Sequence, residues 1–520
     1  MPSALARNPV LRGSHPDPSI LRVGEDYYIA TSTFEWCPGV RIHHSRDLAH
    51  WRCLGGALTR PAQVDLTGVP DSGGVWAPCL SYADGLFYLV YSDVESFGGF
   101  WDTPNFVVTA TSPEGPWSDP VPLHARGFDP SLFHDDDGRS WLLSNRCDWR
   151  PGMPWASGII VQEYSRAEGK LIGTPEVIFT GTEAGYTEGP HLYRRDGWYH
   201  LVTAEGGTSW EHQVTVARSR SILGPYEPDP AGPALTARHD PSLTLQKAGH
   251  ASLVDTPGGD WFLVHLTGRP LTPRGRCVLG RETALQRVTW PAGGWPRVEG
   301  GVPAEVVPLP LEAHPWPREQ PDGGWTGTEW STLRRPADED WMTVRDGRLR
   351  VRGGQSPWSR VRPSLVARRA TSTRCGLTVP VDFAPEDSQQ LAGITAYYNT
   401  QSWYFLAVTF REGIGRCLEL LASDRGELTV LAGAPTRLPD ARPVHLRVEL
   451  DGADLRFSHS RDAETWTTLP AVLDAGILSD EHATDGRSWG FTGAFLGVWA
   501  VDLTGGGVQA DFGVPAYTEL

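Results

Sequence analysis

Hydrophobic and polar positions repeat along the N-terminal part of the chain. A turn that contains acidic residues or glycine leads into a short apolar strand rich in aromatic residues, and this unit occurs five times. Asp-Gly pairs supply the positive φ angles of tight hairpins, so each unit predicts a hairpin turn followed by a strand. The five copies are residues 25–29, 84–90, 137–143, 196–202 and 259–264.

The spacing of these units indicates a β-propeller. Each unit has an aromatic marker residue, and successive markers lie 60, 53, 58 and 63 residues apart. These distances are about the length of a four-stranded propeller blade with its loops, so we predict five blades. A large β-sandwich or a β-helix is the alternative. The markers are Tyr28, Tyr88, Trp141, Tyr199 and Phe262.

A chemically distinctive residue stands 11 or 12 positions before each marker. These residues are Asp17, Trp76, Asp129, Glu188 and His250. Equivalent positions of successive blades point to the same place, so the five side chains should converge at the propeller axis. Three carboxylates in one pocket carry a desolvation cost that packing alone does not explain. The cluster therefore predicts an active site, and a sandwich or β-helix would not account for it.

The second half of the chain lacks the blade motif. We predict a propeller domain at residues 1–312, a linker with Pro315, Pro317 and Pro321, and a second domain at residues 325–520. The second domain contains alternating strand patterns, which favour a β-sandwich of the jelly-roll, concanavalin-like kind. The whole chain is thus expected to be all-β. The strand patterns are at residues 365–367, 393–398, 403–408 and 446–450.

Composition and charge narrow the class of function. With 22 Trp, 58 Gly and 44 Pro among 520 residues, the chain suits short strands and tight turns. A net charge of -16 disfavours nucleic acid and anionic membranes as partners, and a neutral sugar fits better. The N-terminus has no apolar signal region and no long apolar run follows. We therefore expect a cytoplasmic protein that is neither secreted by a standard signal nor bound to a membrane. The seven cysteines lack CxxC spacing, which favours reduced thiols over a zinc site or a disulfide framework.

Six motifs carry a resemblance to a known family. The chain resembles glycoside hydrolase family 43, in its β-xylosidase branch, over almost its whole length. The resemblance implies an exo-acting, inverting enzyme that releases D-xylose from the non-reducing ends of xylobiose and short β-1,4-xylo-oligosaccharides. The motifs are at residues 14–19, 74–78, 127–131, 187–191, 249–253 and 279–283.

The resemblance assigns a role to each carboxylate. Asp17 would be the general base, Glu188 the general acid, and Asp129 the residue that orients the acid and raises its pKa by like-charge repulsion. Asp17 and Asp129 both lie in Asp-Pro-Ser sequences, and the alternative is that these simply form Asx turns. A third copy holds Asp240, which lies 22 residues before Phe262, so we predict a loop residue there.

Other residues are expected to line the sugar pocket. The resemblance suggests Phe34, Trp76 and Ala77 around the terminal sugar, with Arg281 on its hydroxyls, because aromatic faces pack against sugar C–H groups. The alternatives are core packing for Phe34 and Trp76, and a surface ion pair with Glu282 for Arg281. Thr208 is a weaker candidate.

An aromatic residue of the second domain is expected to close the mouth of the active site. In the resembling enzymes such a residue restricts entry to chain ends, and the matching stretch here holds Phe491 and Phe495. We predict Phe495 in preference to Phe491. The alternative for each is the core of the sandwich.

The resemblance also bears on metals and partners. No cofactor is expected. Some family members hold calcium on the axis near the residue that matches His250, but no Asp-rich loop is visible here. We therefore favour a water-filled axis, with His250 hydrogen-bonded near Asp17 or to the sugar as a substrate-binding residue. A homodimer or homotetramer is expected. The competing functions are an α-L-arabinofuranosidase or bifunctional enzyme, an endo-acting enzyme, and a non-catalytic carbohydrate-binding protein.

Overall fold

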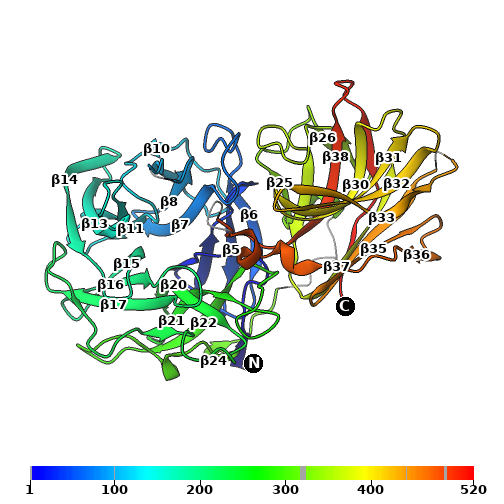
Figure 1. Ribbon diagram of the computed structural model, residues 1–520. Coiled ribbons are helices and arrows are strands. Elements are labelled where there is room, and N and C mark those ends of the chain that lie inside the picture. The colour runs from blue at the N-terminus through cyan, green and yellow to red at the C-terminus, as the bar shows by residue number, and fades with distance from the viewer. Residues whose placement is uncertain (1–2, 99, 317–323, 441, 485–488) are drawn as a thin grey trace.

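Two all-β units lie side by side in a computed structural model (Figure 1). The structure describes residues 3–98, 100–316, 324–440, 442–484 and 489–520. The predicted linker residue Pro315 is among them, and Pro317 and Pro321 lie outside the described residues. No helix in these ranges combines the length and apolar character needed to cross a membrane. All seven cysteines are free.

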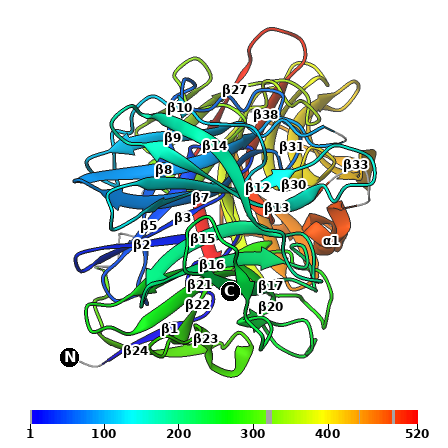
Figure 2. The same ribbon diagram turned by 90° about the vertical axis from the view of Figure 1, so that its left-hand side faces the viewer.

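The first unit is the predicted five-bladed propeller, seen in front of the second unit in Figure 2. Each blade is an antiparallel sheet with a path of four strands. Blade one is β2 (Ser19–Val23), β3 (Asp26–Thr31), β5 (Gly39–Ser45) and β6 (Arg52–Leu58). Blade two is β7 (Gly74–Ala83), β8 (Leu86–Val94), β9 (Asn105–Ala110) and β10 (Val121–Pro122). Blade three is β11 (Ser131–His134), β12 (Ser140–Cys147), β13 (Ala156–Ser165) and β14 (Lys170–Phe179).

The last two blades complete the ring. Blade four is β15 (Glu188–Arg195), β16 (Trp198–Glu205), β17 (Gln213–Ser219) and β18 (Glu227–Pro228), with β19 (Leu235–Thr236) also on β17. Blade five is β20 (Gln246–Asp255), β21 (Trp261–Gly268), β22 (Arg281–Thr289) and β23 (Arg297–Val298), followed by the 3-10 turn η1 (Glu299–Gly301). A separate pair, β1 (Ser3–Arg7) with β24 (Val306–Glu312), brings the start of the chain next to the end of the propeller.

The five aromatic markers occupy the second strand of each blade: β3, β8, β12, β16 and β21. Tight turns precede these strands, as the pattern predicts. Asp84 and Gly85 have φ angles of 51° and 80°, and Asp196 and Gly197 have 51° and 74°. These are the positive values that two-residue hairpins require.

The second unit is a sandwich of two large antiparallel sheets. The first has the order β33-β32-β31-β30-β38-β28-β25-β4, and its edge strand β4 (Trp36–Cys37) comes from the propeller. Pairing of β4 with β25 therefore joins the two units by backbone hydrogen bonds. The other strands are β25 (Trp330–Leu333), β28 (Leu365–Arg369), β30 (Gln390–Asn399), β31 (Ser402–Arg411), β32 (Gly415–Asp424), β33 (Glu427–Arg437) and β38 (Phe495–Asp502).

The second sheet has the order β26-β27-β39-β29-β34-β35-β36, with β37 on β35 and β40 on β29. Its strands are β26 (Met342–Arg345), β27 (Arg348–Arg352), β29 (Arg374–Asp382), β34 (Val444–Asp451), β35 (Asp454–Ser460), β36 (Trp466–Thr468), β37 (Leu473–Asp474), β39 (Gln509–Phe512) and β40 (Ala516–Glu519). Short helical segments are η2 (Gly324–Thr326), η3 (Ala475–Leu478) and α1 (Asp480–Ala483).

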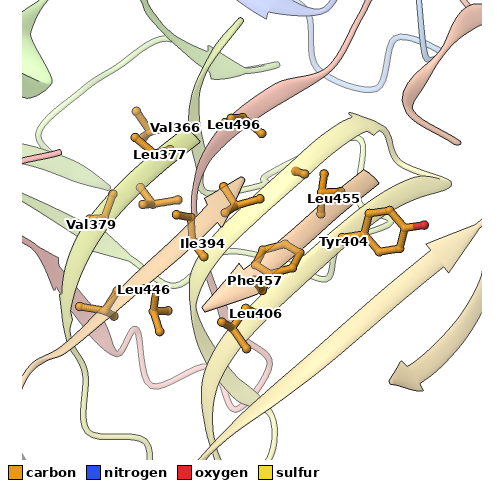
Figure 3. Packing of buried hydrophobic residues seen from close by; sticks show 14 of the residues in the cluster. Val366, Leu377, Val379, Ile394, Tyr404, Leu406, Leu446, Leu455, Phe457 and Leu496 are labelled. Atoms are coloured by element: carbon orange, nitrogen blue, oxygen red, sulfur yellow. The ribbon is translucent and has the colours of Figure 1, made fainter. Parts of the chain in front are cut away.

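Alternating side chains of the two sheets meet in the core of the sandwich (Figure 3). Ile394, Leu406 and Leu496 of the first sheet pack in the same cluster as Leu446 and Phe457 of the second. Full burial of one such side chain stabilises the fold by roughly 1.5–3 kcal/mol.

Candidate active site

The five residues predicted to converge all line one cavity of about 520 Å³. Asp17, Trp76, Asp129, Glu188 and His250 reach it from five different blades. The inner strands that carry or follow these residues pack around the axis, as the contacts of β2 with β7 and β20 and of β15 with β11 and β20 show. The second unit adds residues from α1 and from the segment before β38.

Irregular backbone turns these side chains into the cavity. Asp17 and Asp129 lie two residues before β2 and β11, and each has a φ angle of 56°. His250 has a φ of 43° within β20, where the register shifts on both sides of Gly249. The pairing of β7 shifts after Trp76, and that of β15 shifts after Glu188. Bulges and left-handed residues of this kind redirect side chains next to active sites.

Asp17 is held by a short hydrogen-bond chain. The Ser32 hydroxyl donates to Asp17 Oδ2 at 2.6 Å, and the Ala77 N–H donates to the Ser32 Oγ at 2.7 Å. The Nδ1 of His250 lies 3.6 Å from Asp17 Oδ1. Ala77, which was predicted to line the pocket, is buried and is not among the residues that line this cavity. Its backbone N–H instead helps to fix Asp17 through Ser32.

Asp129 is placed to orient Glu188. Its Oδ2 accepts a hydrogen bond of 2.9 Å from the N–H of Gly189, the residue that follows Glu188 in the chain. Asp129 is buried, at 6% exposure, which limits its contact with water. Burial raises the pKa of Asp129 well above its usual range, and the charges of Glu188 and Asp17 raise it further. This hydrogen bond ties Asp129 to the backbone next to Glu188.

Glu188 has the pKa of an acid that is protonated near neutral pH. Burial is the largest cause and the Asp17 charge is the second, and together they raise the pKa to about 8 against the opposing charge of Arg281. The sequence predicts Asp129 as the source of this shift. Burial is the largest cause in the structure, and Asp129 and Glu188 also raise each other's pKa because their buried carboxylates repel.

Arg281 connects the site to the second unit. Its Nε lies 3.3 Å from Asp480 Oδ2, and its Nη2 donates to the Gly490 carbonyl at 3.3 Å. The guanidinium also lies over the Phe491 ring, 4.5 Å from its centroid. The alternative of a surface ion pair with Glu282 is wrong, because Arg281 is buried and Glu282 binds Arg269 in a bidentate pair.

Three aromatic rings from both units meet at one wall of the cavity. The Phe491 ring lies 5.2 Å from Trp76 and 6.2 Å from Phe34, and Phe34 lies 6.3 Å from Trp76. Hydrogen bonds fix the group, since the Trp76 Nε1 donates to the Ser72 carbonyl at 2.8 Å and the Phe491 N–H donates to the Ser72 Oγ at 3.0 Å. The predicted positions of Phe34 and Trp76 are thus found in the cavity wall.

The aromatic residue that the sandwich supplies is Phe491, and the preference for Phe495 is wrong. Phe495 begins β38 and is 1% exposed. Its ring stacks on Trp36 at 4.0 Å with an interplanar angle of 9°, inside the cluster that joins β4 to the sandwich. The Phe495 side chain therefore packs in the interface between the units. The irregular segment before β38, which contains Phe491, reaches the cavity instead.

Sequence reasoning missed several residues of the cavity. Thr208 lines the cavity, as predicted. A second set of aromatic side chains and an ionic cluster of Lys247 with Asp480 and Glu481 were not predicted. Lys247 donates to Asp480 Oδ2 at 3.2 Å and to Glu481, which places two carboxylates of α1 beside the site. Lys247, Asp480 and Glu481 do not occupy the position that repeats in every blade, so the repeat could not predict that they line the cavity. The further lining residues are Trp101, Phe128, Trp155, Tyr186, Gly206, Gly207, Ser209, Trp210, Thr484, Trp489 and Gly490.

His250 suits a hydrogen-bonding role better than a metal site. Burial lowers its pKa, so the imidazole tends to be neutral. Among the described residues there is no group of three or more His, Cys, Asp or Glu side chains that could hold a metal ion. Calcium is usually held by about six to eight oxygen ligands, so the side chains around His250 do not fit it.

Asp240 lies in an exposed turn, as predicted. Its Oδ1 accepts hydrogen bonds from the N–H of Ser242 at 2.9 Å and from the hydroxyl of Ser242 at 2.5 Å. The same Asp-Pro-Ser sequence thus forms an Asx turn here, whereas Asp17 and Asp129 line the cavity. Position in the blade separates the two outcomes.

Comparison with known proteins agrees with this arrangement. The model of "Glycosyl hydrolases family 43" matches residues 6–296, and that of the "Beta xylosidase C-terminal Concanavalin A-like domain" matches residues 322–518. The chain is 48% identical to "Xylosidase/arabinosidase 43B" of Humicola insolens, over 97% of this chain and 96% of that protein. It is 44% identical to "Beta-xylosidase" of Bacillus subtilis (strain 168), over 98% of this chain and 99% of that protein.

A solved structure is also similar over the full length. The crystal structure of xylan beta-1,4-xylosidase from Bacillus Halodurans C-125 superposes with a TM-score of 0.96 at 48% identity, covering 99% of this chain and 100% of that chain. Both units and their relative placement are therefore shared with that protein.

Proposed function

The chain belongs to glycosyl hydrolase family 43, and on this premise we propose that it is an exo-acting, inverting β-xylosidase. Its substrates would be xylobiose and short β-1,4-xylo-oligosaccharides, from whose non-reducing ends it releases D-xylose. The observation that carries the proposal is the single cavity that joins three carboxylates of the propeller to an aromatic wall completed by the second unit.

We assign the chemistry to two of the carboxylates. Glu188, with its raised pKa, carries the proton that the leaving sugar oxygen needs, so it is the general acid. Asp17, held by Ser32, activates the attacking water as general base. Asp129 is a positioning residue, because it binds the backbone N–H next to Glu188. An inverting mechanism needs such a pair, separated so that a water fits between base and sugar.

The walls of the cavity suit a neutral sugar. Phe34, Trp76 and Phe491 offer apolar faces to the C–H groups of a xylose ring, while Arg281 and His250 offer hydrogen bonds to its hydroxyls. Because Phe491, Asp480 and Trp489 come from the second unit, that unit narrows access to the cavity. Chain ends would enter, and the interior of a polymer would not.

Arabinosidase activity is the second candidate. The relative from Humicola insolens is named for both activities, and arabinofuranose presents hydroxyl groups similar to those of xylopyranose. A purely carbohydrate-binding role is less well supported, because all three carboxylates are present in the cavity. A homo-oligomer and a cytoplasmic location remain proposals from the sequence.

The substrate proposal can be tested with three substrates at equal concentration. We expect release of xylose from xylobiose at a kcat/KM at least about tenfold above that for an aryl α-L-arabinofuranoside, and little product from polymeric xylan. Reducing sugars and product lengths would be followed by chromatography. A faster reaction with the arabinofuranoside would make this protein an arabinofuranosidase, and oligomers cut from xylan would exclude exo action.

Substitution of Phe491 tests the contribution of the second unit. Phe491→Ala is expected to lower kcat/KM for xylobiose roughly 10- to 100-fold, because the aromatic wall and the partner of Arg281 are lost. Phe495→Leu is the matched control, since Phe495 lies in the interface cluster. It should lower the Tm while changing the kinetics of the folded enzyme little. Wild-type kinetics for Phe491→Ala would remove the second unit from the active site.

A further inference from the structure

A small cavity of about 130 Å³ lies between the two units, and it shares no lining residue with the active site. Propeller strands β5 and β6 form one side, and β28 with the two residues before β25 forms the other. Its lining is rich in cationic groups. Three arginines, Arg41, Arg368 and Arg369, line it with one carboxylate, Glu329. His15 and His43 also line it.

Two of these arginines are buried without a carboxylate partner in the part of the chain that the structure describes. Arg41 is 2% exposed, and its Nη2 donates to the Trp330 carbonyl at 2.6 Å and to the Ser331 hydroxyl at 2.8 Å. Arg369 is 6% exposed, and its Nε donates to the Ser14 carbonyl at 2.6 Å. Glu329 lies 3.7 Å from Arg368 instead.

This arrangement leaves positive charge in need of an anion. Burial and the neighbouring Arg41 lower the pKa of Arg369 to about 9, which reflects the cost of two buried like charges. Unpaired buried charges are strongly unfavourable unless an opposite charge lies close by. Neutral carbonyl oxygens satisfy hydrogen bonds but supply no charge.

Cys53 is the group placed to supply that charge. Its Sγ lies 3.9 Å from Arg41 Nη1 and accepts a hydrogen bond of 3.4 Å from the Gly55 N–H. Cys53 and His43 are direct cross-strand partners in the β5–β6 pair. Two buried nitrogens of lining residues, Arg41 Nε and His43 Nδ1, have no hydrogen-bond partner among the described residues.

We propose that Cys53 is a reactive cysteine and that this interdomain cavity is where small electrophiles modify the protein. Cys53 is only partly buried and lines the cavity. Burial opposes ionisation of the thiol, but His43 and then Arg41 outweigh it and lower the pKa of Cys53 to about 5. Reactive cysteines are found in such electropositive, partly exposed surroundings.

The reaction with a peroxide illustrates the chemistry. The Cys53 sulfur attacks one oxygen of hydrogen peroxide, a new S–O bond forms and the O–O bond breaks. The sulfur is oxidised to a sulfenic acid, and the peroxide is reduced to water after the departing hydroxide takes a proton from solvent. Modification would replace the thiolate beside Arg41, a side chain that binds the second unit at Thr328 and Trp330.

The test is the pH dependence of alkylation of the intact protein by iodoacetamide, with each cysteine quantified by peptide mass spectrometry. The rate at Cys53 is expected to change less than about twofold between pH 6.5 and 8.5, whereas an unperturbed thiol would change about 50-fold. The dependence of the rate on pH is decisive, and the absolute rate is not. A thiolate of low pKa is a weaker nucleophile, so it can react slowly although it is fully ionised.

Cys147 is the internal control. It is also partly buried, but burial and the charges of Asp129 and Glu188 raise its pKa to about 12, so it should stay unlabelled below pH 9. His43→Gln should move the Cys53 midpoint upward by at least about one pH unit. The absorbance near 240 nm at pH 7, which measures thiolate, should be lower in Cys53→Ser than in the wild type by the amount that one thiolate contributes.

Three results would overturn the proposal. The first is a Cys53 rate that falls tenfold per pH unit below pH 8, and the second is no labelling of Cys53 in the folded protein. The third is unchanged thiolate absorbance in Cys53→Ser. The Cys147→Ser variant should leave that absorbance as in the wild type, which controls for a general effect of losing a thiol.

Discussion

Replacing Glu188 with alanine is expected to lower kcat/KM for xylobiose about 10³- to 10⁴-fold, while an aryl xyloside with a good leaving group loses about tenfold or less. General acid catalysis contributes roughly 10²- to 10⁴-fold, and the contribution is largest when the leaving group is a poor one such as a sugar hydroxyl. An activated phenolate departs without a proton. Steady-state kinetics on both substrates measures the difference directly.

The pH profile provides a second readout of the same residue. Because the pKa of Glu188 is raised to about 8, the acid is protonated below that pH and loses its proton above it. The wild-type kcat/KM for xylobiose should therefore fall as the pH rises through about 8. Glu188→Ala should lack this alkaline limb with the activated substrate. Equal losses on both substrates, or an unchanged alkaline limb, would assign the acid to another residue.

Replacing Asp17 with alanine is expected to reduce activity at least about 10⁴-fold on both substrates. Water must be activated whichever group leaves, so a better leaving group does not rescue loss of the base. The same two assays give the result, and the contrast with Glu188→Ala separates base from acid.

Asp240→Ala is the matched control for the Asp17 variant. It changes the same Asp-Pro-Ser sequence, but Asp240 lies in an exposed turn outside the cavity. Its kinetics should match the wild type, with at most a small decrease in Tm from loss of the Asx turn. An Asp17→Ala enzyme that keeps activity within tenfold of the wild type would exclude Asp17 as the base.

The repeated unit allowed much of the propeller and its site to be predicted. The aromatic markers lie on the second strand of every blade, so a residue 11 or 12 positions earlier falls at or near the start of the inner strand. That geometry is why Asp17, Asp129 and Glu188 could be placed together from spacing alone, and why Asp240 could be excluded.

Contacts between the two units could not be predicted in this way. Phe491 and Phe495 are four residues apart, and their sequence pattern does not show that β38 begins at Phe495. The pairing of β4 with β25 and the reach of Asp480 to Arg281 join residues far apart in the chain, where no period applies. The contribution of burial to the Glu188 pKa shift was likewise hidden from the sequence, because burial depends on the assembled cavity.

The anomeric form of the first product tests the central claim most directly. Hydrolysis of xylobiose would be followed by proton NMR from the first seconds, before mutarotation mixes the anomers. Asp17 as base and Glu188 as acid, on blades one and four, predict a single displacement by water, so the xylose released from the non-reducing end should appear first as the α anomer. Initial appearance of β-xylose would contradict the assignment, because retention requires a carboxylate nucleophile in place of an activated water.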